Sequence, residues 1–495
     1  MPTYTIEFLV VGLGVFMLLW EAFAAPKNKA KLALIGAAGL TVALVLLLMN
    51  MCCGCGMDVP AWMSRFYTTE GYAMFFKAFA LVSTIIVLLM SYDFRSVLNR
   101  YTSNDNSCSN TGEFYTLPIF ACAGLMWMAS ATDLVSIFVS LELVTITFYI
   151  MVAYMRRNVG SLEAGVKYLI LGALSTGFLV YGIAWLYGAM GTTDLKVIAE
   201  TLSPSSGWTN YPPLAEFADP SRHYALLFGL SLIILSLGFK VGAAPMQLWI
   251  PDVYQGAPTP ITAFLSVASK AAGFGVAIAI LTPFINSIEY GAKVKMILVV
   301  LAAATLLYGN LSALAQTNFK RLLAYSSIAH AGFMIMGMAA GAVEFVMIYL
   351  VTYLIMTFAA FFILGLVRVQ DDSDEISAFD GLAKRNPHLG LAMTIIMAGM
   401  AGVPLTAGFV GKLLMFTAAI GSVPMIVIII AIISAAAGFY YYFKIIRAIY
   451  WHVPKTDKPL EVPCISKIAI IILTVATILV GVIPNIAENI VKFSL

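Results

Sequence analysis

Apolar stretches recur along the whole chain, and each is about as long as a helix that crosses a lipid bilayer. Such a helix needs ~20 apolar residues to span the hydrocarbon core. On this criterion the pattern predicts an all-α polytopic membrane protein with fourteen spans. The expected spans are residues 6–23, 32–51, 72–92, 114–131, 134–154, 164–188, 224–249, 261–286, 294–314, 322–341, 345–367, 389–419, 423–450 and 465–486.

Two of the predicted spans contain a proline that is expected to interrupt the helix. Pro245 lacks a backbone N–H and its ring clashes with the carbonyl four residues earlier, so we expect a break just after Lys240. Pro404 predicts a second break, this time ahead of Lys412. Irregular backbone at membrane depth is tolerated only where it is buried in protein or lines a hydrated cavity. Both breaks therefore indicate internal polar sites.

The composition agrees with this pattern and excludes two large classes of protein. Hydrophobic residues make up 61% of the 495 positions and charged residues only 11%. The mean hydropathy of +0.93 is too high for a soluble globular protein. The net charge of +3 is small and the basic residues are scattered through short loops, so no basic face exists for a nucleic acid.

Glu7 stands where a signal peptide would carry positive charge, which indicates a retained first helix.

Basic residues in the loops favour an orientation with both termini on the outer face of the membrane. The inner loops would then hold Lys27, Lys29, Lys31, Arg95, Arg100, Arg156, Arg157, Lys320, Arg321, Arg368, Lys384, Arg385, Lys444, Arg447, Lys455, Lys458 and Lys467. The outer loops would hold only Arg65, Lys77, Lys196, Arg222, Lys293, Lys295 and Lys492.

The loops and cysteines offer little chemistry. Residues 190–223 indicate an outward surface loop, and the acidic residues within 371–380 indicate a solvated inner connector. No histidine or second cysteine pair lies near the cluster at the end of the second span, so a tetrahedral metal site is not expected. That cluster consists of Cys52, Cys53 and Cys55, and the isolated cysteines are Cys108, Cys122 and Cys464.

A few ionisable residues remain inside the predicted spans. They are Glu142, Lys167, Lys240, Lys270, His330 and Lys412. A charge at mid-membrane costs at least ~2.5 to 3.5 kcal/mol, so each needs a reason. One reason is structural: the side chain snorkels to the membrane surface or forms a fixed ion pair that holds helices together. This explanation fits Lys167 best, because Lys167 is near a membrane edge. At His330 a satisfied core histidine and a proton carrier are equally consistent with the sequence.

The other reason is proton transfer. Burial lowers the pKa of a lysine and raises that of a glutamate, and a nearby opposite charge counteracts both. At ~4 Å and an effective dielectric constant of ~20 an ion pair is worth about 4 kcal/mol, so moving one partner away can load or release a proton. A row of lysines with one glutamate, Glu142, therefore predicts a proton relay. Ser266 and Ser269 are placed to hold water beside Lys270.

Residues 239–260 around Lys240 and Pro245 resemble a signature of the antiporter-like membrane subunits of bacterial NADH-quinone oxidoreductase, respiratory complex I. Residues 269–274 around Lys270 continue the resemblance. Further matches are Glu142 between two leucines, Lys167 with Tyr168 and residues 172–177, residues 322–333 around His330, and residues 404–416 around Lys412. Together they run from the fourth predicted span to the thirteenth.

The resemblance implies a fold of fourteen helices with two inverted five-helix repeats. The repeats would occupy residues 113–286 and 287–452, each with one interrupted helix. Residues 1–112 would form three N-terminal spans and residues 453–495 a C-terminal span. Nothing functional is carried over to the three N-terminal spans, which match no specific pattern.

The resemblance also implies roles for the buried charges. Glu142 and Lys240 would be a coupled pair, Lys270 the central connecting lysine, and Lys412 the group that faces the exit channel. Lys167 and His330 would be further positions of the proton relay.

Partners and location follow from the same resemblance. The chain would lie in a bacterial inner membrane with periplasmic termini, beside an antiporter-like chain M and small membrane subunits, and would be coupled indirectly to the quinone pool. It would bind no cofactor, since FMN and iron–sulfur clusters belong to other subunits. Within the family the chain N type fits best, because chain M has glutamate where Lys412 stands, chain L is longer, and both favour histidines where this sequence has Gln247 and Tyr254.

Three other classes of protein can be weighed against this one. A subunit of a cation/proton antiporter or a membrane-bound hydrogenase would use the same lysines. A quinone-binding redox subunit or a solute carrier is disfavoured, because there is no cysteine set for an iron–sulfur cluster and His223, His388 and His452 lie at span ends or in loops. A pure scaffold would not need the deep lysines.

Overall fold

The computed structural model describes residues 2–23, 29–53, 59–102, 111–202, 220–454, 456 and 458–494. The named elements within these ranges are all helices. They are α1 (Tyr4–Phe23), α2 (Lys31–Cys53), α3 (Ala73–Asp93), α4 (Arg95–Thr102), α5 (Glu113–Ser130), α6 (Leu134–Val152), α7 (Val159–Met190), α8 (Leu195–Leu202), α9 (Pro220–Val241), η3 (Met246–Leu248), α10 (Trp249–Gly256), α11 (Thr259–Phe264), η4 (Leu265–Ser269), α12 (Lys270–Asn286), α13 (Gly291–Leu314), α14 (Phe319–Ala339), α15 (Val343–Asp371), η5 (Ile376–Phe379), α16 (Leu382–Arg385), α17 (Pro387–Ala401), α18 (Ala407–Ala419), α19 (Met425–Trp451), α20 (Cys464–Val482) and α21 (Asn485–Ser494).

Every predicted span coincides with a helix or with consecutive helical segments. Within the described ranges, twelve helices are long and apolar enough to cross a membrane by length and composition. The predicted segments outside this set are α5, with 18 residues, and the pair α17 and α18, with 15 and 13. The all-α membrane fold is therefore confirmed, while the count of fourteen spans, the inverted repeats and their boundaries stay predictions.

Both predicted helix breaks are present. α9 ends at Val241, and a turn through Gly242 leads to Pro245 and the short η3. α17 ends at Ala401, where Gly402 has a φ of 93°, and α18 begins only at Ala407. A third irregularity was not predicted: the eighth span contains a π-helical segment, η4, directly before α12. Such π-bulges are frequent at functional sites.

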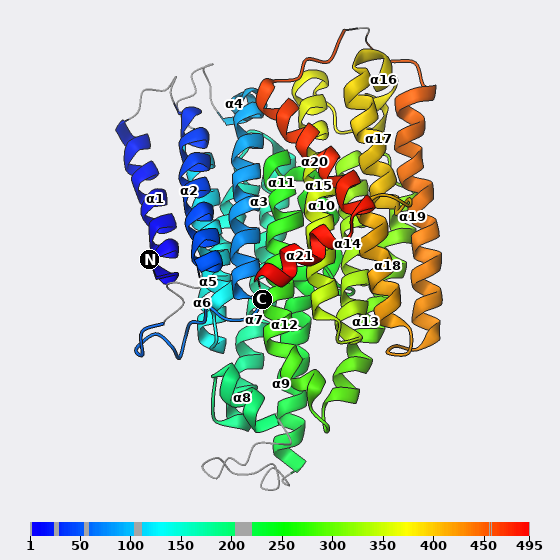
Figure 1. The fold of residues 1–495 in the computed structure, drawn as a ribbon. Coiled ribbons are helices and arrows are strands. Elements are labelled where there is room, and N and C mark those ends of the chain that lie inside the picture. Colours follow the sequence, from blue (N-terminus) through cyan, green and yellow to red (C-terminus); the bar gives the residue numbers. More distant parts are fainter. Residues whose placement is uncertain are drawn as a thin grey trace.

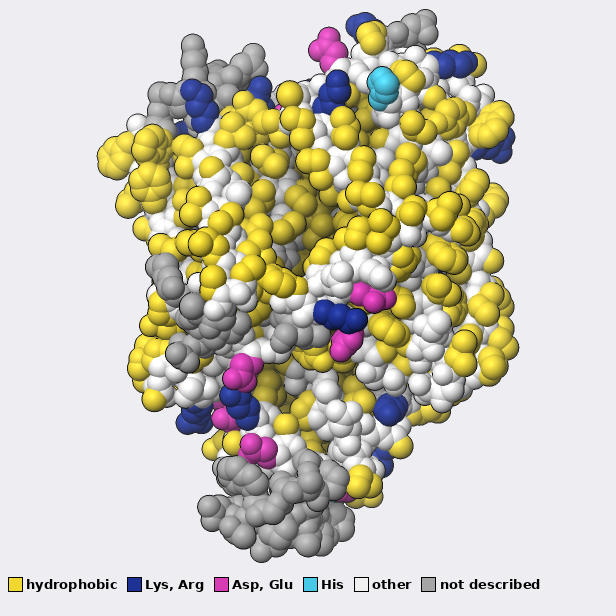
Figure 2. All heavy atoms as spheres, in the orientation of Figure 1, with side chains coloured by type: hydrophobic (Ala, Val, Ile, Leu, Met, Phe, Trp, Pro, Cys, Tyr) yellow, Lys and Arg dark blue, Asp and Glu magenta, His cyan; other side chains and the backbone are white. Residues whose placement is uncertain are grey.

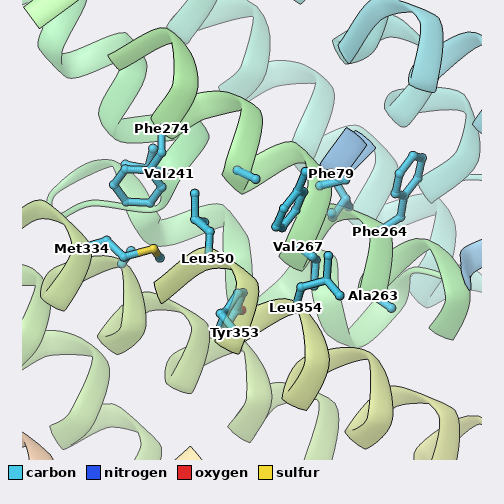
Figure 3. Packing of buried hydrophobic residues seen from close by; sticks show 14 of the residues in the cluster. Phe79, Val241, Ala263, Phe264, Val267, Phe274, Met334, Leu350, Tyr353 and Leu354 are labelled. Atoms are coloured by element: carbon cyan, nitrogen blue, oxygen red, sulfur yellow. The ribbon is translucent and has the colours of Figure 1, made fainter. Parts of the chain in front are cut away.

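The helices pack side by side, with α1 and α2 at one end of the bundle and α17 to α19 at the other (Figure 1). α14 and α15 lie in the middle and are almost wholly buried. Figure 3 shows side chains from four elements meeting there: Val241 of α9, Phe274 of α12, Met334 of α14 and Leu350 of α15. The core thus joins segments from the two halves of the chain.

The outer surface is what a lipid environment requires. Figure 2 shows hydrophobic side chains over most of one face, with charged side chains toward the upper edge, in the lower part and in one small group near the middle. Large apolar residues are exposed along several helices, among them Phe16 and Trp20 on α1 and Ile432 on α19. In water such a belt would be strongly unfavourable, whereas lipid chains solvate it.

The predicted location of Lys77 in an outer loop is wrong. It lies on α3 with its side chain fully buried, and its Nζ is 2.9 Å from Oε1 of Glu7, which is also fully buried. The hydroxyl of Tyr67 donates to Glu7 at 2.8 Å and accepts from Lys77 at 2.7 Å. A complete buried ion pair therefore joins α1 to α3.

The acidic inner segment is also a correction, because it is not a freely solvated connector. Asp371 accepts two hydrogen bonds from the Arg385 guanidinium, at 2.6 and 3.0 Å. Asp374 lies 3.5 Å from Nζ of Lys320, which is itself buried in α14. Asp380 lies 2.9 Å from His452. The carboxylates of this segment bind basic side chains at the ends of neighbouring helices.

The remaining differences concern short helices. The expected loop at 190–223 contains α8, and its residues 203–219 lie outside the described ranges. The last predicted span matches α20, which ends at Val482, and a further short helix, α21, begins at Asn485. Also outside the described ranges are Lys27, Cys55, Cys108 and Lys455.

Candidate functional site

Lys240 lies in the last turn of α9, at the first helix break, and its side chain is buried. Its Nζ donates to Oγ1 of Thr145 on α6 at 2.5 Å. Glu142, half-buried one turn earlier on α6, accepts instead from Oγ1 of Thr176 on α7 at 2.7 Å. The expected Glu142–Lys240 pair is therefore not a direct contact. Glu142 and Thr145 are three residues apart and share a face of α6, so the Glu142 carboxylate still acts on Lys240 electrostatically.

Lys270 is the first residue of α12 and follows the π-helical segment directly. Its Nζ donates to the backbone oxygen of Ser327 on α14 at 2.5 Å and also to the Ser327 hydroxyl. The ammonium group lies 5.6 Å from the ring centre of Tyr353 on α15. Ser266, expected to hold water beside Lys270, is hydrogen-bonded to the Tyr353 hydroxyl at 2.6 Å.

His330 lies buried on α14 between two tyrosine hydroxyls. Its Nδ1 is 2.7 Å from the hydroxyl of Tyr349 on α15, and its Nε2 is 3.1 Å from the hydroxyl of Tyr442 on α19. Tyr442 is also hydrogen-bonded to the Ser326 hydroxyl. Both ring nitrogens thus have a partner that can donate or accept a proton.

Lys412 extends from α18 back across the second helix break. Its Nζ donates to the backbone oxygens of Met400 and Ala401, at 2.9 and 2.7 Å. These carbonyls belong to the last turn of α17, where helical partners are lacking and the helix dipole is negative. The ammonium group also lies 5.7 Å from the ring centre of Phe333.

The three deep lysines share one property that sets them apart from Lys77. Among the described residues no carboxylate oxygen lies within 4.0 Å of the Nζ of Lys240, Lys270 or Lys412. Their partners are hydroxyl and carbonyl oxygens, which carry no net charge. The fixed ion pair considered from the sequence is therefore found at Lys77 and not at these three positions.

Lys167 differs from the deep lysines. Its side chain is 42% exposed, and its Nζ lies 2.8 Å from Glu163 and 2.7 Å from Asp252. Asp252 also binds Arg321 of α14 at 2.8 Å. These residues line a cavity of about 490 Å³ between the ends of α7, α10 and α14, which we call the inner vestibule after the predicted orientation.

Sequence reasoning missed the hydroxyl groups that connect the charged residues. Tyr254, Tyr349, Tyr353 and Tyr442 are all buried side chains of helices. A tyrosine in mid-span has to satisfy its hydroxyl inside the protein, so its position in the sequence was a usable signal. Which group it meets depends on the fold.

The described residues contain no group of three or more His, Cys, Asp or Glu placed to hold a metal ion. Cys52, Cys53 and Cys464 are exposed, and Cys122 is buried. The polar groups that the site brings together are lysines, hydroxyls and an imidazole.

Comparisons with known proteins agree with this geometry. Residues 131–438 match the family described as "NADH:quinone oxidoreductase/Mrp antiporter, TM". A helical membrane fold with interrupted helices and buried lysines, matched by this family, defines an antiporter-like membrane protein. NADH-quinone oxidoreductase subunit N of Anoxybacillus flavithermus is 34% identical over 495 residues, covering 98% of this chain and 94% of the relative. The chain belongs to the NADH-quinone oxidoreductase subunit N family.

Other relatives and solved structures extend the comparison. Subunit N of Trichlorobacter lovleyi is 38% identical over 421 residues, covering 84% of this chain and 80% of the relative. A chain of respiratory complex I from Thermus thermophilus is 29% identical with a TM-score of 0.78, over 98% of both chains. A chain of the Mrp complex from Dietzia sp. has the same TM-score at 18% identity, over 99% and 96% of the two chains, and so shares the fold.

Proposed function

We propose that this chain is a proton-translocating subunit in the membrane arm of an NADH-quinone oxidoreductase. The observation that carries the proposal is the set of three buried lysines, Lys240, Lys270 and Lys412, held by neutral oxygens. A lysine paired with a carboxylate keeps its proton, because losing it leaves a buried charge unpaired. A lysine held by a hydroxyl or a carbonyl can release its proton without that cost.

Packing supports an order for the first half of the relay. A Cβ built at Gly273 on α12 would lie 3.2 Å from the Cβ of Lys240. Gly273 is one helical turn after Lys270, so the two lysines belong to adjacent turns of contacting helices. Glu142, on the face of α6 that also holds Thr145, would modulate the charge on Lys240 when the distance between them changes.

α14 supports the connection to the second half. Lys270 contacts this helix at Ser327, and Lys412 contacts it at Phe333. His330 lies between those two positions, so the proton would pass from Lys270 through His330 to Lys412 and leave on the outer side. Lys167, in the inner vestibule, would act where protons enter.

The proposal includes the surroundings of the chain. It would lie in a bacterial inner membrane with periplasmic termini, beside chain M and small membrane subunits of the same complex. FMN and iron–sulfur clusters would belong to other subunits, and this chain would carry no redox chemistry. NADH and quinone would then act on it only through conformational changes elsewhere in the complex.

NADH-driven proton uptake in inverted membrane vesicles tests this function. Lys240→Ala and Lys270→Ala should each lower uptake at least ~10-fold while the complex still assembles on a native gel, since loss of a proton-transferring group typically costs ~100-fold or more. Lys295→Ala, at an exposed lysine of α13, is the matched control and should pump normally. Normal pumping by both deep-lysine variants would overturn the proposal, and sodium-dependent uptake without NADH would favour an independent antiporter.

A further inference from the structure

A hydrogen-bonded row of four neutral side chains lies between Lys270 and Lys412. Ser326 and His330 are on α14, Tyr442 is on α19 and Tyr349 is on α15. Hydrogen bonds join Ser326 to Tyr442, Tyr442 to Nε2 of His330 at 3.1 Å, and Nδ1 of His330 to Tyr349 at 2.7 Å. All four side chains are buried. We call these residues the tyrosine–histidine file.

The chemistry of the file restricts its direction. A neutral imidazole has one N–H donor and one nitrogen acceptor, whereas a tyrosine hydroxyl can donate and accept at once. One tyrosine therefore donates to His330 while the other accepts from it. Every hydrogen bond in the file then points the same way, which is the arrangement a hydrogen-bonded chain needs to pass a proton.

The two ends of the file lie next to the lysine sites. Ser326 directly precedes Ser327, which accepts from Lys270. At the other end, the ring of Phe333 stacks on Tyr349 with ring centres 6.4 Å apart and lies 5.7 Å from the Lys412 ammonium group. Among the described contacts no hydrogen bond joins Tyr349 to Lys412, so a water molecule has to complete that step.

We propose that Tyr442 and Tyr349 are proton-passing residues on either side of His330, a role that rests on the function proposed above. With Nδ1–H donating to Tyr349, the Tyr442 hydroxyl gives its proton to Nε2 and takes one from Ser326, which is reprotonated from the Lys270 side. Nδ1 then gives its proton to the Tyr349 oxygen, whose own proton leaves toward Lys412.

This sequence of transfers balances. One proton enters at Ser326, one leaves at Tyr349, and every group in the file is neutral again. The ring proton has moved from Nδ1 to Nε2, so the file has to return to its first arrangement before the next transfer. The file therefore passes single protons and cannot act as an open channel for a continuous current.

The chain contains a close control for Tyr442. Tyr441 is the neighbouring residue on α19 and is equally buried, and its hydroxyl donates to Oδ1 of Asn310 on α13 at 3.1 Å. It also lies within hydrogen-bonding reach of the Tyr442 hydroxyl, but it is not one of the links between Ser326 and Tyr349. Replacing either tyrosine by phenylalanine removes one hydroxyl and keeps the ring. Only Tyr442→Phe interrupts the file.

The test measures NADH-driven proton uptake, per assembled complex, in inverted vesicles that carry Tyr442→Phe, Tyr349→Phe or Tyr441→Phe. Assembly is quantified on a native gel, so a purely structural loss appears as less complex with normal uptake per complex. We expect proton uptake per complex to fall at least ~10-fold in Tyr442→Phe and Tyr349→Phe. Uptake in Tyr441→Phe should stay within about twofold of the unchanged protein. File variants that pump like Tyr441→Phe would overturn the inference.

Lys270→Ala in the same assay separates this inference from the proposed function. Loss of uptake in Lys270→Ala together with normal uptake in both file variants overturns the role of the tyrosines alone. Normal uptake in Lys270→Ala overturns the relay itself, and the role of the file with it.

Discussion

The deep lysines bind neutral hydroxyl and carbonyl oxygens: a threonine hydroxyl for Lys240, a serine hydroxyl and carbonyl for Lys270, and two helix-terminal carbonyls for Lys412. Hydrogen bonds to a charged group contribute about 1.5–3 kcal/mol each, which offsets only part of the several kcal/mol that burying the charge costs. The charged form is therefore held weakly, so a modest electrostatic change can shift the lysine between its two protonation states.

Gly402 offers a test at single-residue resolution. Its φ of 93° is strained for any other residue, and a Cβ there would lie 3.0 Å from Cδ and 3.3 Å from Nζ of Lys412. Gly421 has a φ of 80° but no heavy atom within 4 Å of its Cβ position. Each alanine variant should lose roughly 1–2 kcal/mol of stability from backbone strain.

Only Gly402→Ala should also impair proton uptake, because its methyl group displaces the Lys412 ammonium group from Met400 and Ala401. The measurement pairs thermal inactivation of the solubilised complex with uptake in inverted vesicles. Equal uptake in Gly402→Ala and Gly421→Ala would show that the position of Lys412 does not matter for pumping.

The two interrupted helices both hold a lysine at their break, although the lysine and the break follow each other in opposite order along the chain. Lys240 precedes its break and lies in the last turn of α9, whereas Lys412 follows its break and reaches back to the last turn of α17. Lys240 is thus attached to the C-terminal end of a half-helix, and the Lys412 ammonium group binds the C-terminal carbonyls of one, where the dipole favours positive charge. A hydrogen bond also connects the two sides of the break at Pro245, because Nε1 of Trp249 donates to the Phe239 carbonyl at 3.0 Å.

The ion pair between α1 and α3 is expected to be structural. Glu7→Gln should lower stability by about 3–5 kcal/mol, because it leaves the Lys77 ammonium group buried without a counter-charge. Burial is the largest cause of the raised pKa of Tyr67 and persists in the variant, so the Tyr67 hydroxyl stays protonated and cannot replace the lost charge. Thermal inactivation of the solubilised complex measures the effect.

The double variant Glu7→Gln/Lys77→Met is the control for that experiment. Removing both charges should recover most of the lost stability, since the unpaired charge is the cause. Full stability of Glu7→Gln alone would mean that Lys77 is neutral or reaches water.

The molecule as a whole has two different polar ends. One end, which the predicted orientation places inside, carries the vestibule of about 490 Å³ with Lys167, Asp252 and Arg321. The opposite end has a cavity of about 370 Å³ whose lining includes Tyr72 and the single carboxylate of Glu344. Between them the buried residues of α14 and α15 form the middle of the bundle (Figure 1). A proton path through the molecule has to cross this middle layer.

The orientation of the chain can be tested by cysteine labelling. In a variant with all six cysteines replaced by serine, Lys467→Cys at the start of α20 should react with a membrane-impermeant maleimide only in inverted vesicles. Lys492→Cys on α21 should react only in right-side-out vesicles. Both lysines are exposed, so access depends on the side of the membrane. The reverse pattern would place the termini inside.

Much of the fold and part of the candidate site could be predicted before the structure was known. The spans, the breaks at Pro245 and Pro404 and the depth of Lys270 depend on local properties, namely hydropathy, the missing N–H of proline and the cost of a buried charge. The π-helix before Lys270 and the ion pair of Lys77 were missed, because neither leaves a periodic signal in the sequence.

Local chemistry was therefore enough to identify a membrane protein with interrupted helices and ionisable groups at depth. The partners of those groups were decided by the folded chain, because a hydrogen bond depends on how helices far apart in sequence rotate and pack. Thr145 beside Lys240, Ser327 beside Lys270 and the carbonyls of α17 beside Lys412 are contacts of that kind. The same packing aligned two tyrosines with His330 and left the neighbouring Tyr441 facing Asn310.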